Sequence, residues 1–276
     1  RRKATDRFVT LLVMTAFAVA IVPLISILTT VISRGIPVMS SEFFSSSMRN
    51  VVGEGGGIQH AIMGTLIITG FATLISVPIG LFAAIYLVEY SNDGPTARGL
   101  RFLTDVMTGI PSIVAGLFAY ALFVLFFGEG VRMGVGGAVA LSVLMVPVVI
   151  RSSEEMLKLV PHELREASWA LGVPRWRTIV KIVLPTALAG IVTGVTLAIA
   201  RVIGETAPLL IIAGMTDSVN TNLPVFTYSA MMNPGVPAEP SIERAWGAAL
   251  TLLVIVMLLN LIARVISYIF SPATRR

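Results

Sequence analysis

Residues 154–185 read EEMLKLVPHELREASWALGVPRWRTIVKIVLP and separate two long apolar blocks of the chain. The pattern predicts two short helices joined at Gly172-Val173-Pro174, because glycine suits the left-handed position after a helix and proline suits a first helical turn. The first helix carries Leu164, Ala167, Ser168 and Leu171 on one face, and the second presents Trp176, Ile179, Val180 and Val183. The segment is too polar to enter lipid, so its apolar side needs either a protein partner or the surface of a membrane leaflet.

Six apolar blocks surround this segment. They span about 8–32, 61–88, 102–127, 133–150, 184–214 and 246–270. A helix crosses a bilayer with about 20 apolar residues. Hydrophobic residues make up 55% of the 276 residues and charged residues 13%, with a mean hydropathy of +0.89. Because no soluble core of this size buries so much apolar surface, we predict an all-α polytopic membrane protein with six transmembrane helices in a single domain over 1–276.

Two local features of the predicted spans add detail. The first block is too long for a signal-peptide core, so we expect it to be a retained span. Prolines recur within the spans and are expected to mark kinks, since they remove a backbone hydrogen bond. These prolines are Pro23, Pro78, Pro111, Pro147 and Pro208.

Lysine and arginine residues predict the orientation of the chain. With the N-terminus in the cytoplasm, fifteen of the 20 lie on inner segments, four lie on outer segments, and Arg201 alone falls within a span. This bias satisfies the positive-inside rule in one orientation only. We therefore expect both termini and the loop 151–183 to face the cytoplasm, and the loops 33–60 and 215–245 to face outward.

The spacing of small residues in the inner loop resembles a known signature. Glu166-Ala167-Ser168, three residues, Gly172, nine residues, Ile182, one residue and Leu184-Pro185 resemble the EAA motif (E-A-A-x3-G-x9-I-x-L-P) of binding-protein-dependent ABC importer permeases. Only Ser168 departs from it, and serine is also small. The resemblance implies a type I ABC importer permease fold, with an EAA loop over about 151–183 and a coupling helix over about 163–174.

In that family the coupling helix sits in a groove of the ATPase subunit. The resemblance implies that the small residues permit close approach and that Glu166 supplies a polar or ionic contact. The implied coupling residues are Glu166, Ala167, Ser168, Gly172 and Pro174.

A charged pair lies within the fifth predicted span. Arg201 is seventeen residues after Leu184, near mid-membrane, and Glu205 follows one helical turn later. Charges at that depth are costly and normally face a cavity or a partner, so we favour a functional role. The structural alternative is a self-neutralising i, i+4 pair that only stabilises the helix. Pro208 is expected to act as a hinge just beyond the pair.

The run around this pair carries a second resemblance. Residues 201–210, RVIGETAPLL, look like the R-x-x-G-E-T-A-P-L-L stretch of the phosphate-specific permeases of the Pst systems, in particular their A-type subunits. The run GIPSIVAG at 109–116 and Glu89-Tyr90 are also similar to phosphate permeases. The resemblance implies a permease subunit that forms half of a pathway for inorganic phosphate across the bacterial cytoplasmic (inner) membrane, working by alternating access.

The side chains of the pair fit such a role. A guanidinium offers a planar fork to an oxyanion and stays charged in a low dielectric, so Arg201 either contacts phosphate or gates its path. Glu205 either holds Arg201 in place or keeps phosphate from binding too tightly. Asp105, near the start of the third span, is a further pathway candidate.

The resemblance also implies partners in the membrane lipid and on both of its sides. They are a homologous second permease subunit (PstC-like), two ATPase subunits (PstB-like) and an extracytoplasmic phosphate-binding protein (PstS-like). ATP and magnesium are expected on the ATPase subunits, so no cofactor is expected on this chain, and the chain itself is not expected to be an enzyme.

Several other classes of function find no support in the residues. The sequence has no cysteine and no G-x-x-x-x-G-K-[ST] phosphate loop, and Glu166 rather than a second histidine follows four residues after His162. We therefore predict no catalytic residue, no metal site and, since topology explains the net charge of +5, no nucleic-acid partner. Three alternatives remain: a permease for sulfate, molybdate or a small organic solute, a non-transporting scaffold or sensor, and, more distantly, an intramembrane enzyme.

Overall fold

The computed structural model describes residues 2–51, 53–91 and 93–270, and these ranges contain helices and no strand. The longer helices are α1 (Arg2–Gly35), α3 (Gln59–Ile85), α4 (Pro95–Thr108), α5 (Ser112–Phe127), α6 (Gly134–Lys158), α9 (Leu184–Val202) and α12 (Glu239–Phe270). The shorter ones are α2 (Ser41–Ser45), α7 (His162–Ala170), α8 (Arg175–Thr178), α10 (Ala207–Ile212) and α11 (Leu223–Met232). A 3₁₀ turn, η1 (Ile36–Val38), and two π-helical turns, η2 (Tyr86–Tyr90) and η3 (Ile179–Val183), complete the set.

The hydropathy of these helices defines a polytopic membrane protein. Among the described residues, five helices are long and apolar enough to span a membrane, and the bent pair α4–α5 brings the number to six when it counts as one span. The predicted all-α polytopic class is therefore confirmed.

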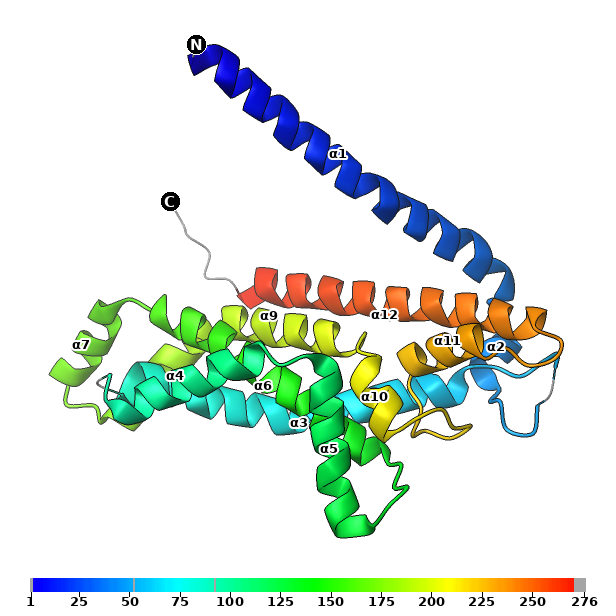
Figure 1. The fold of residues 1–276 in the computed structure, drawn as a ribbon. Helices are drawn as coiled ribbons and strands as arrows, with labels where there is room; N and C mark the ends of the chain where they lie inside the picture. The colour runs from blue at the N-terminus through cyan, green and yellow to red at the C-terminus, as the bar shows by residue number, and fades with distance from the viewer. Residues whose placement is uncertain (1, 52, 92, 271–276) are drawn as a thin grey trace.

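The centre of the bundle is the packing of α3 on α6, with α9 and α12 alongside (Figure 1). Small residues allow α3 and α6 to approach closely: a Cβ atom on Gly80 would lie 2.6 Å from Cγ1 of Val149. The buried Ser76 hydroxyl donates to the Ser142 carbonyl at 3.5 Å across the same contact. Close approach of small residues is the usual basis of helix association in lipid.

Helix α1 differs from the other spans. Figure 1 shows it leaving one end of the bundle and projecting away from the rest of the chain. None of the residues in its most apolar part is buried against the described chain. Its Gly35 end is in contact with the bundle, where a Cβ atom would lie 2.7 Å from Cβ of Leu250. Helix α1 therefore offers a fully exposed apolar surface to lipid or to another subunit.

The helices extend beyond some of the predicted apolar limits. Helix α6 begins at Gly134 and continues past the predicted limit of residue 150 to Lys158, since no proline or glycine stands between Pro147 and Pro161. The predicted span 102–127 falls on α4 and α5, which bend by 106° at Gly109–Pro111. Hydropathy marks where a helix is apolar, whereas prolines and glycines determine where its hydrogen bonding ends.

The five prolines expected to mark kinks divide into two groups. Pro23, Pro78 and Pro147 lie inside continuous helices, whereas Pro111 precedes α5 and Pro208 opens α10 at breaks in the chain's helices. Of the basic residues used for the orientation, Arg1, Arg275 and Arg276 lie outside the described residues.

Candidate functional site

The segment between α6 and α9 forms the predicted helix–glycine–helix unit, which we call the hairpin (α7 and α8, residues 162–178). Gly172 adopts a φ of +74°, the left-handed conformation that favours glycine. The amide of Gly172 donates to the Trp169 carbonyl at 2.9 Å, and that of Val173 donates to Ser168 at 3.2 Å. This pair of bonds is the Schellman motif, which terminates α7 and turns the chain into α8.

The two helices of the hairpin are joined inside by a pair of hydroxyls. The side chains of Ser168 and Thr178 lie 2.8 Å apart, and both residues are buried. Ser168 was predicted among the residues that contact an ATPase. The structure places its side chain inside the hairpin, so its small size serves the approach of α7 to α8.

The outer face of the hairpin has no partner within the described chain. Glu166 and Ala167 are exposed there, and Leu171 is 83% exposed. Further large apolar side chains are exposed around them, namely Leu164, Trp169 and Trp176. A patch of this kind marks a contact with another protein or with a membrane surface.

A buried ion pair holds the hairpin to the second span, and the sequence did not predict it. Arg165 of α7 donates from Nε and Nη2 to Oε1 of Glu89, in η2, at 3.0 and 2.8 Å. The two side chains are only 5% and 4% exposed. The available signal was a lone glutamate at the end of an apolar run, which requires a cationic partner when it is buried.

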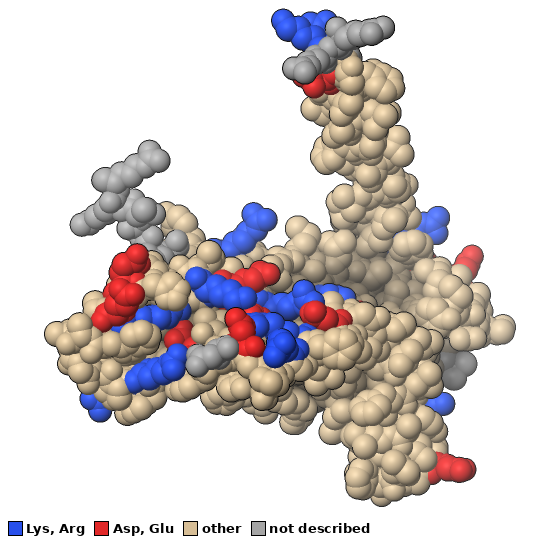
Figure 2. Space-filling view, turned by 60° about the vertical axis from the view of Figure 1, so that its left-hand side comes forward, with Lys and Arg blue, Asp and Glu red and all other residues tan. Residues whose placement is uncertain are grey.

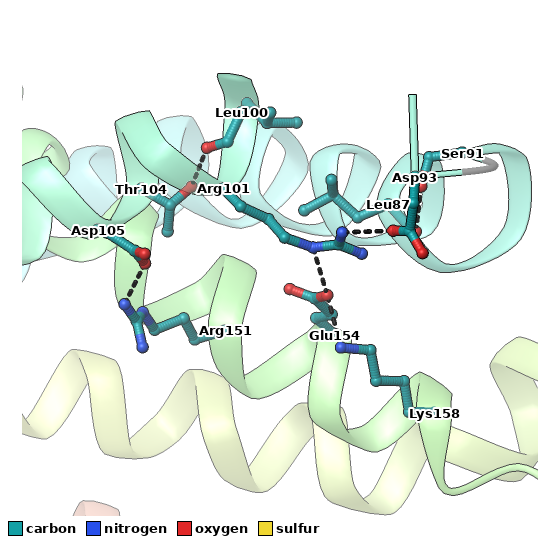
Figure 3. A network of polar contacts seen from close by, with 10 residues as sticks. All are labelled: Leu87, Ser91, Asp93, Leu100, Arg101, Thr104, Asp105, Arg151, Glu154 and Lys158. Atoms are coloured by element: carbon teal, nitrogen blue, oxygen red, sulfur yellow. Dashed lines mark hydrogen bonds and ion pairs between the residues drawn. The ribbon is translucent and has the colours of Figure 1, made fainter. Parts of the chain in front are cut away.

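A second group of charges lies beside the hairpin, where Figure 2 shows acidic and basic side chains gathered on one surface. In this network, shown in Figure 3, Arg101 of α4 contacts Asp93 at 2.6 Å and Glu154 of α6 at 3.3 Å. Glu154 also pairs with Lys158 at 2.7 Å. The hydrogen bond from Arg101, and then its positive charge, lower the pKa of the Asp93 carboxyl below its ordinary value.

Asp105 belongs to the same network. It pairs with Arg151 of α6 rather than with Arg201 or Glu205, the two residues with which it was grouped as a pathway candidate. The pair lies near the hairpin end of α6, where it holds α4 to α6.

The other charged pair lies at a break between two helices. Helix α9 ends at Val202 and α10 begins at Ala207, so Glu205 does not sit one helical turn after Arg201 as predicted. Pro208 explains the break, because its ring clashes with the carbonyl four residues earlier, at Gly204, and it has no N–H to donate. Arg201 is exposed and Glu205 is half-buried, and neither side chain has a hydrogen bond or ion pair among the described residues.

The two sequence stretches that resemble phosphate permeases meet at this break. Gly116 of α5 packs on Pro208 of α10 so closely that a Cβ atom would lie 2.5 Å from Cα of Pro208. Helix α5 itself begins after the bend at Gly109–Pro111. Two interrupted helices therefore lie side by side, an arrangement that transporters use for substrate sites.

The candidate site thus has two parts at different places in the bundle. One is the hairpin with an exposed apolar face, and the other is the helix break with unpaired charges. Among residues 2–51, 53–91 and 93–270, no group of three or more histidine, aspartate or glutamate side chains could hold a metal ion. This combination of spans, a hairpin with an exposed apolar face and interrupted helices is that of a transport permease subunit.

The chain belongs to the family of binding-protein-dependent transport system inner membrane components, whose model matches residues 76–276. It is therefore a multi-pass component of a transport system of the inner membrane. A relative in Mycobacterium tuberculosis (strain CDC 1551 / Oshkosh), phosphate transport system permease protein PstA 1, is 45% identical over 100% of this chain and 92% of that protein. The PstA of Yersinia pestis is 39% identical over 96% of this chain and 90% of that protein.

Solved structures of ABC importers share the fold. A chain of a bacterial alginate ABC transporter, in complex with a periplasmic protein, has a TM-score of 0.70 at 12% identity and covers 96% of both chains. A chain of an inward-facing methionine ABC transporter has a TM-score of 0.63 at 18% identity, over 85% of this chain and 100% of that one. At this level of identity the likeness establishes the fold of an ABC importer permease.

Proposed function

We propose that this chain is the permease subunit of an ATP-driven phosphate importer and forms half of the pathway across the cytoplasmic membrane. One observation carries the proposal: a chain 45% identical over its whole length to a phosphate transport permease places an unpaired arginine at a helix break. The two stretches that resemble phosphate permeases adjoin at that break through Gly116 and Pro208.

The unpaired Arg201 fits the chemistry of the proposed substrate. A guanidinium that has no carboxylate partner keeps its donors available for an oxyanion, and a fork of two N–H groups matches two phosphate oxygens. Glu205, half-buried across the break, limits how tightly the anion is held, because a like charge nearby opposes it. A transport pathway requires such balance, since it must release what it binds.

The exposed face of the hairpin supplies the link to an energy source. We assign Glu166, Ala167 and Leu171 to a groove of an ATPase subunit, with ATP and magnesium bound there and not on this chain. Closure of two such subunits (PstB-like) moves the hairpins, and the pathway between this chain and a second permease subunit (PstC-like) then opens outward. The hairpin and both termini face the cytoplasm in this proposal.

The remaining partner is a phosphate-binding protein (PstS-like) on the outer side. It delivers phosphate to the loops 33–60 and 215–245, which contain α2 and α11 at the end of the bundle opposite α7 (Figure 1). Membrane lipid covers the remaining apolar surface of the spans.

The test of this proposal is anion uptake by the whole complex. The complex that co-purifies with this chain is placed in liposomes with ATP inside, and uptake of labelled phosphate, sulfate and molybdate is measured. We expect ATP-dependent uptake of phosphate that excess sulfate does not inhibit. Uptake of sulfate or molybdate in its place would assign the chain to another oxyanion, and no uptake of any anion by an intact complex would favour a scaffold.

A further inference from the structure

Both helices of the hairpin contact the end of the second span. From α7, Arg165 pairs with Glu89 as described above, and from α8 the guanidinium of Arg175 lies 5.3 Å from the ring centre of Tyr90. Glu89 and Tyr90 are neighbours at the end of η2, the π-helical turn that continues α3. Covalent connection ties the hairpin to α6 and α9, and these two side-chain contacts join it to the end of the second span.

All three guanidinium nitrogens of Arg165 donate hydrogen bonds that hold the hairpin in this position. Its Nη1 donates to the Val160 carbonyl at 2.6 Å, and its Nη2 donates to the Leu157 carbonyl at 3.0 Å in addition to Glu89. Leu157 lies in the last turn of α6 and Val160 just beyond it, where the chain leaves for α7. One guanidinium therefore joins the end of α6, the start of the hairpin and the end of the second span.

A buried ion pair is a poor device for stability alone. Two apolar side chains of similar volume would fill the same space at less cost in desolvation, whereas breaking a buried pair leaves a charge uncompensated. The pair thus makes the position of η2 strictly dependent on the position of α7. The other ion pairs at this end of the bundle have side chains that are 34–79% exposed on at least one partner, which makes them weaker constraints.

We infer that Arg165 and Glu89 are positioning residues that transmit movement of the hairpin into α3, so that the hairpin drives the second span as well as α9. The inference rests on the proposed function, because it assigns a route for the coupling that transport requires. The two π-helical turns, η2 and η3, lie where the moving hairpin meets α3 and α9. Such turns are frequent at functional sites.

From η2 the movement has a direct route to the core. Helix α3 packs along α6, and the buried cluster around Ile68, Leu141 and Val202 joins α3, α6 and the end of α9. Val202 is the residue after Arg201. A shift of α3 therefore changes the packing of Val202 beside the helix break directly, without movement along the length of α9.

The experiment measures phosphate uptake and ATP hydrolysis in the same liposomes that contain the whole complex. In Glu89→Gln, which removes the charge and keeps the shape, we expect the phosphate transported per ATP hydrolysed to fall about tenfold, within the usual range of coupling between sites. The KM for phosphate should stay unchanged, because the substituted residue is far from the break. Glu89→Asp keeps the charge and should recover most of the ratio, whereas Arg165→Lys keeps the charge but loses the fork of donors and should recover only part of it.

Asp93→Asn provides the matched control. Asp93 also pairs with an arginine at this end of the bundle, but it is exposed, and we expect its loss to leave the ratio unchanged. An unchanged ratio in Glu89→Gln would overturn the inference. A proportional loss of uptake and hydrolysis in Glu89→Gln, Glu89→Asp and Arg165→Lys would overturn it as well, since that result indicates lost assembly. Failure of the wild-type complex to take up phosphate would instead contradict the proposed function.

Discussion

Two arginine–glutamate pairs in this chain have the same chemical groups and opposite surroundings. Arg165 and Glu89 are almost fully buried and joined by two hydrogen bonds, with backbone carbonyls occupying the remaining donors of the arginine. Arg201 and Glu205 lie at a helix break, exposed and half-buried, and each lacks a partner in the described part of the chain. The first pair is complete without a ligand, and the second is not.

The difference teaches how each pair functions. A saturated buried pair fixes one element to another, because separating it leaves a charge uncompensated. An unpaired arginine in a span is stable only when it faces a cavity, a ligand or another subunit. We therefore assign mechanical coupling to the hairpin end and contact with the anion to the break.

The largest expected effect is at the break. We expect Arg201→Ala to lower phosphate uptake about 100-fold, since charge-assisted hydrogen bonds contribute about 1.5–3 kcal/mol. Assembly of the complex should not change, because Arg201 holds no other residue of the chain. Uptake of labelled phosphate and co-purification of the partners measure the two effects. Arg201→Lys keeps the charge without the fork, so its uptake should lie between that of the wild type and that of Arg201→Ala. Wild-type uptake in Arg201→Ala would show that the unpaired arginine does not contact the anion.

A somewhat smaller effect is expected in the turn of the hairpin. A β-branched residue at the φ of +74° adopted by Gly172 costs about 1–2 kcal/mol, so Gly172→Val should reduce uptake and ATPase co-purification about tenfold while membrane insertion persists. Nothing lies within 4 Å of a Cβ atom there, which makes the backbone the only source of strain. Gly172→Asn, which tolerates this conformation, should be mild. Equal effects of Asn and Val would show that side-chain size, rather than backbone strain, matters.

The contact between the two phosphate-permease stretches gives the third prediction. In Gly116→Ala the new Cβ atom would lie 2.5 Å from the backbone of Pro208, and overpacking of this kind costs about 1–3 kcal/mol. We expect uptake to fall several-fold and the thermal unfolding temperature to drop. Gly70→Ala is the matched control, because a Cβ atom there meets nothing within 4 Å. If both variants behave alike, the close approach of α5 to α10 is not important for transport.

The smallest effect is expected inside the hairpin. Ser168→Ala removes the hydrogen bond to Thr178 and restores the second alanine of the EAA signature. The loss amounts to about 1 kcal/mol of stability, and uptake should change by less than about twofold. Thermal unfolding of the purified complex and phosphate uptake measure these values. A complete loss of uptake would place Ser168 in the ATPase contact instead.

The sequence predicted what depends on local pattern. Composition and apolar blocks predicted a helical polytopic protein, and the glycine and proline around Gly172 predicted the hairpin. It failed where the outcome depends on contacts between distant segments. The role of Arg165 was not predicted, because its partner, Glu89, lies 76 residues away in the sequence.

The break at residues 203–206 was missed for a different reason. The apolar block continues through it to residue 214, so hydropathy gave no sign that α9 ends at Val202. The signal was local: Gly204 and Pro208 stand four residues apart, which is the spacing at which a proline removes the hydrogen bond to the earlier carbonyl. Reading Pro208 as a breaker rather than a kink would have separated Glu205 from the helix of Arg201.

The central claim is that the buried pair of Arg165 and Glu89 couples the hairpin to the second span, whereas the unpaired charges at the helix break contact phosphate. The most direct test measures the KM for phosphate and the phosphate transported per ATP in the same liposomes for Arg201→Lys and Glu89→Gln. Our account predicts that Arg201→Lys raises the KM at an unchanged transport ratio, and that Glu89→Gln lowers the ratio at an unchanged KM. If both variants change the same quantity, or if the two effects are exchanged, the assignment of the two pairs is wrong.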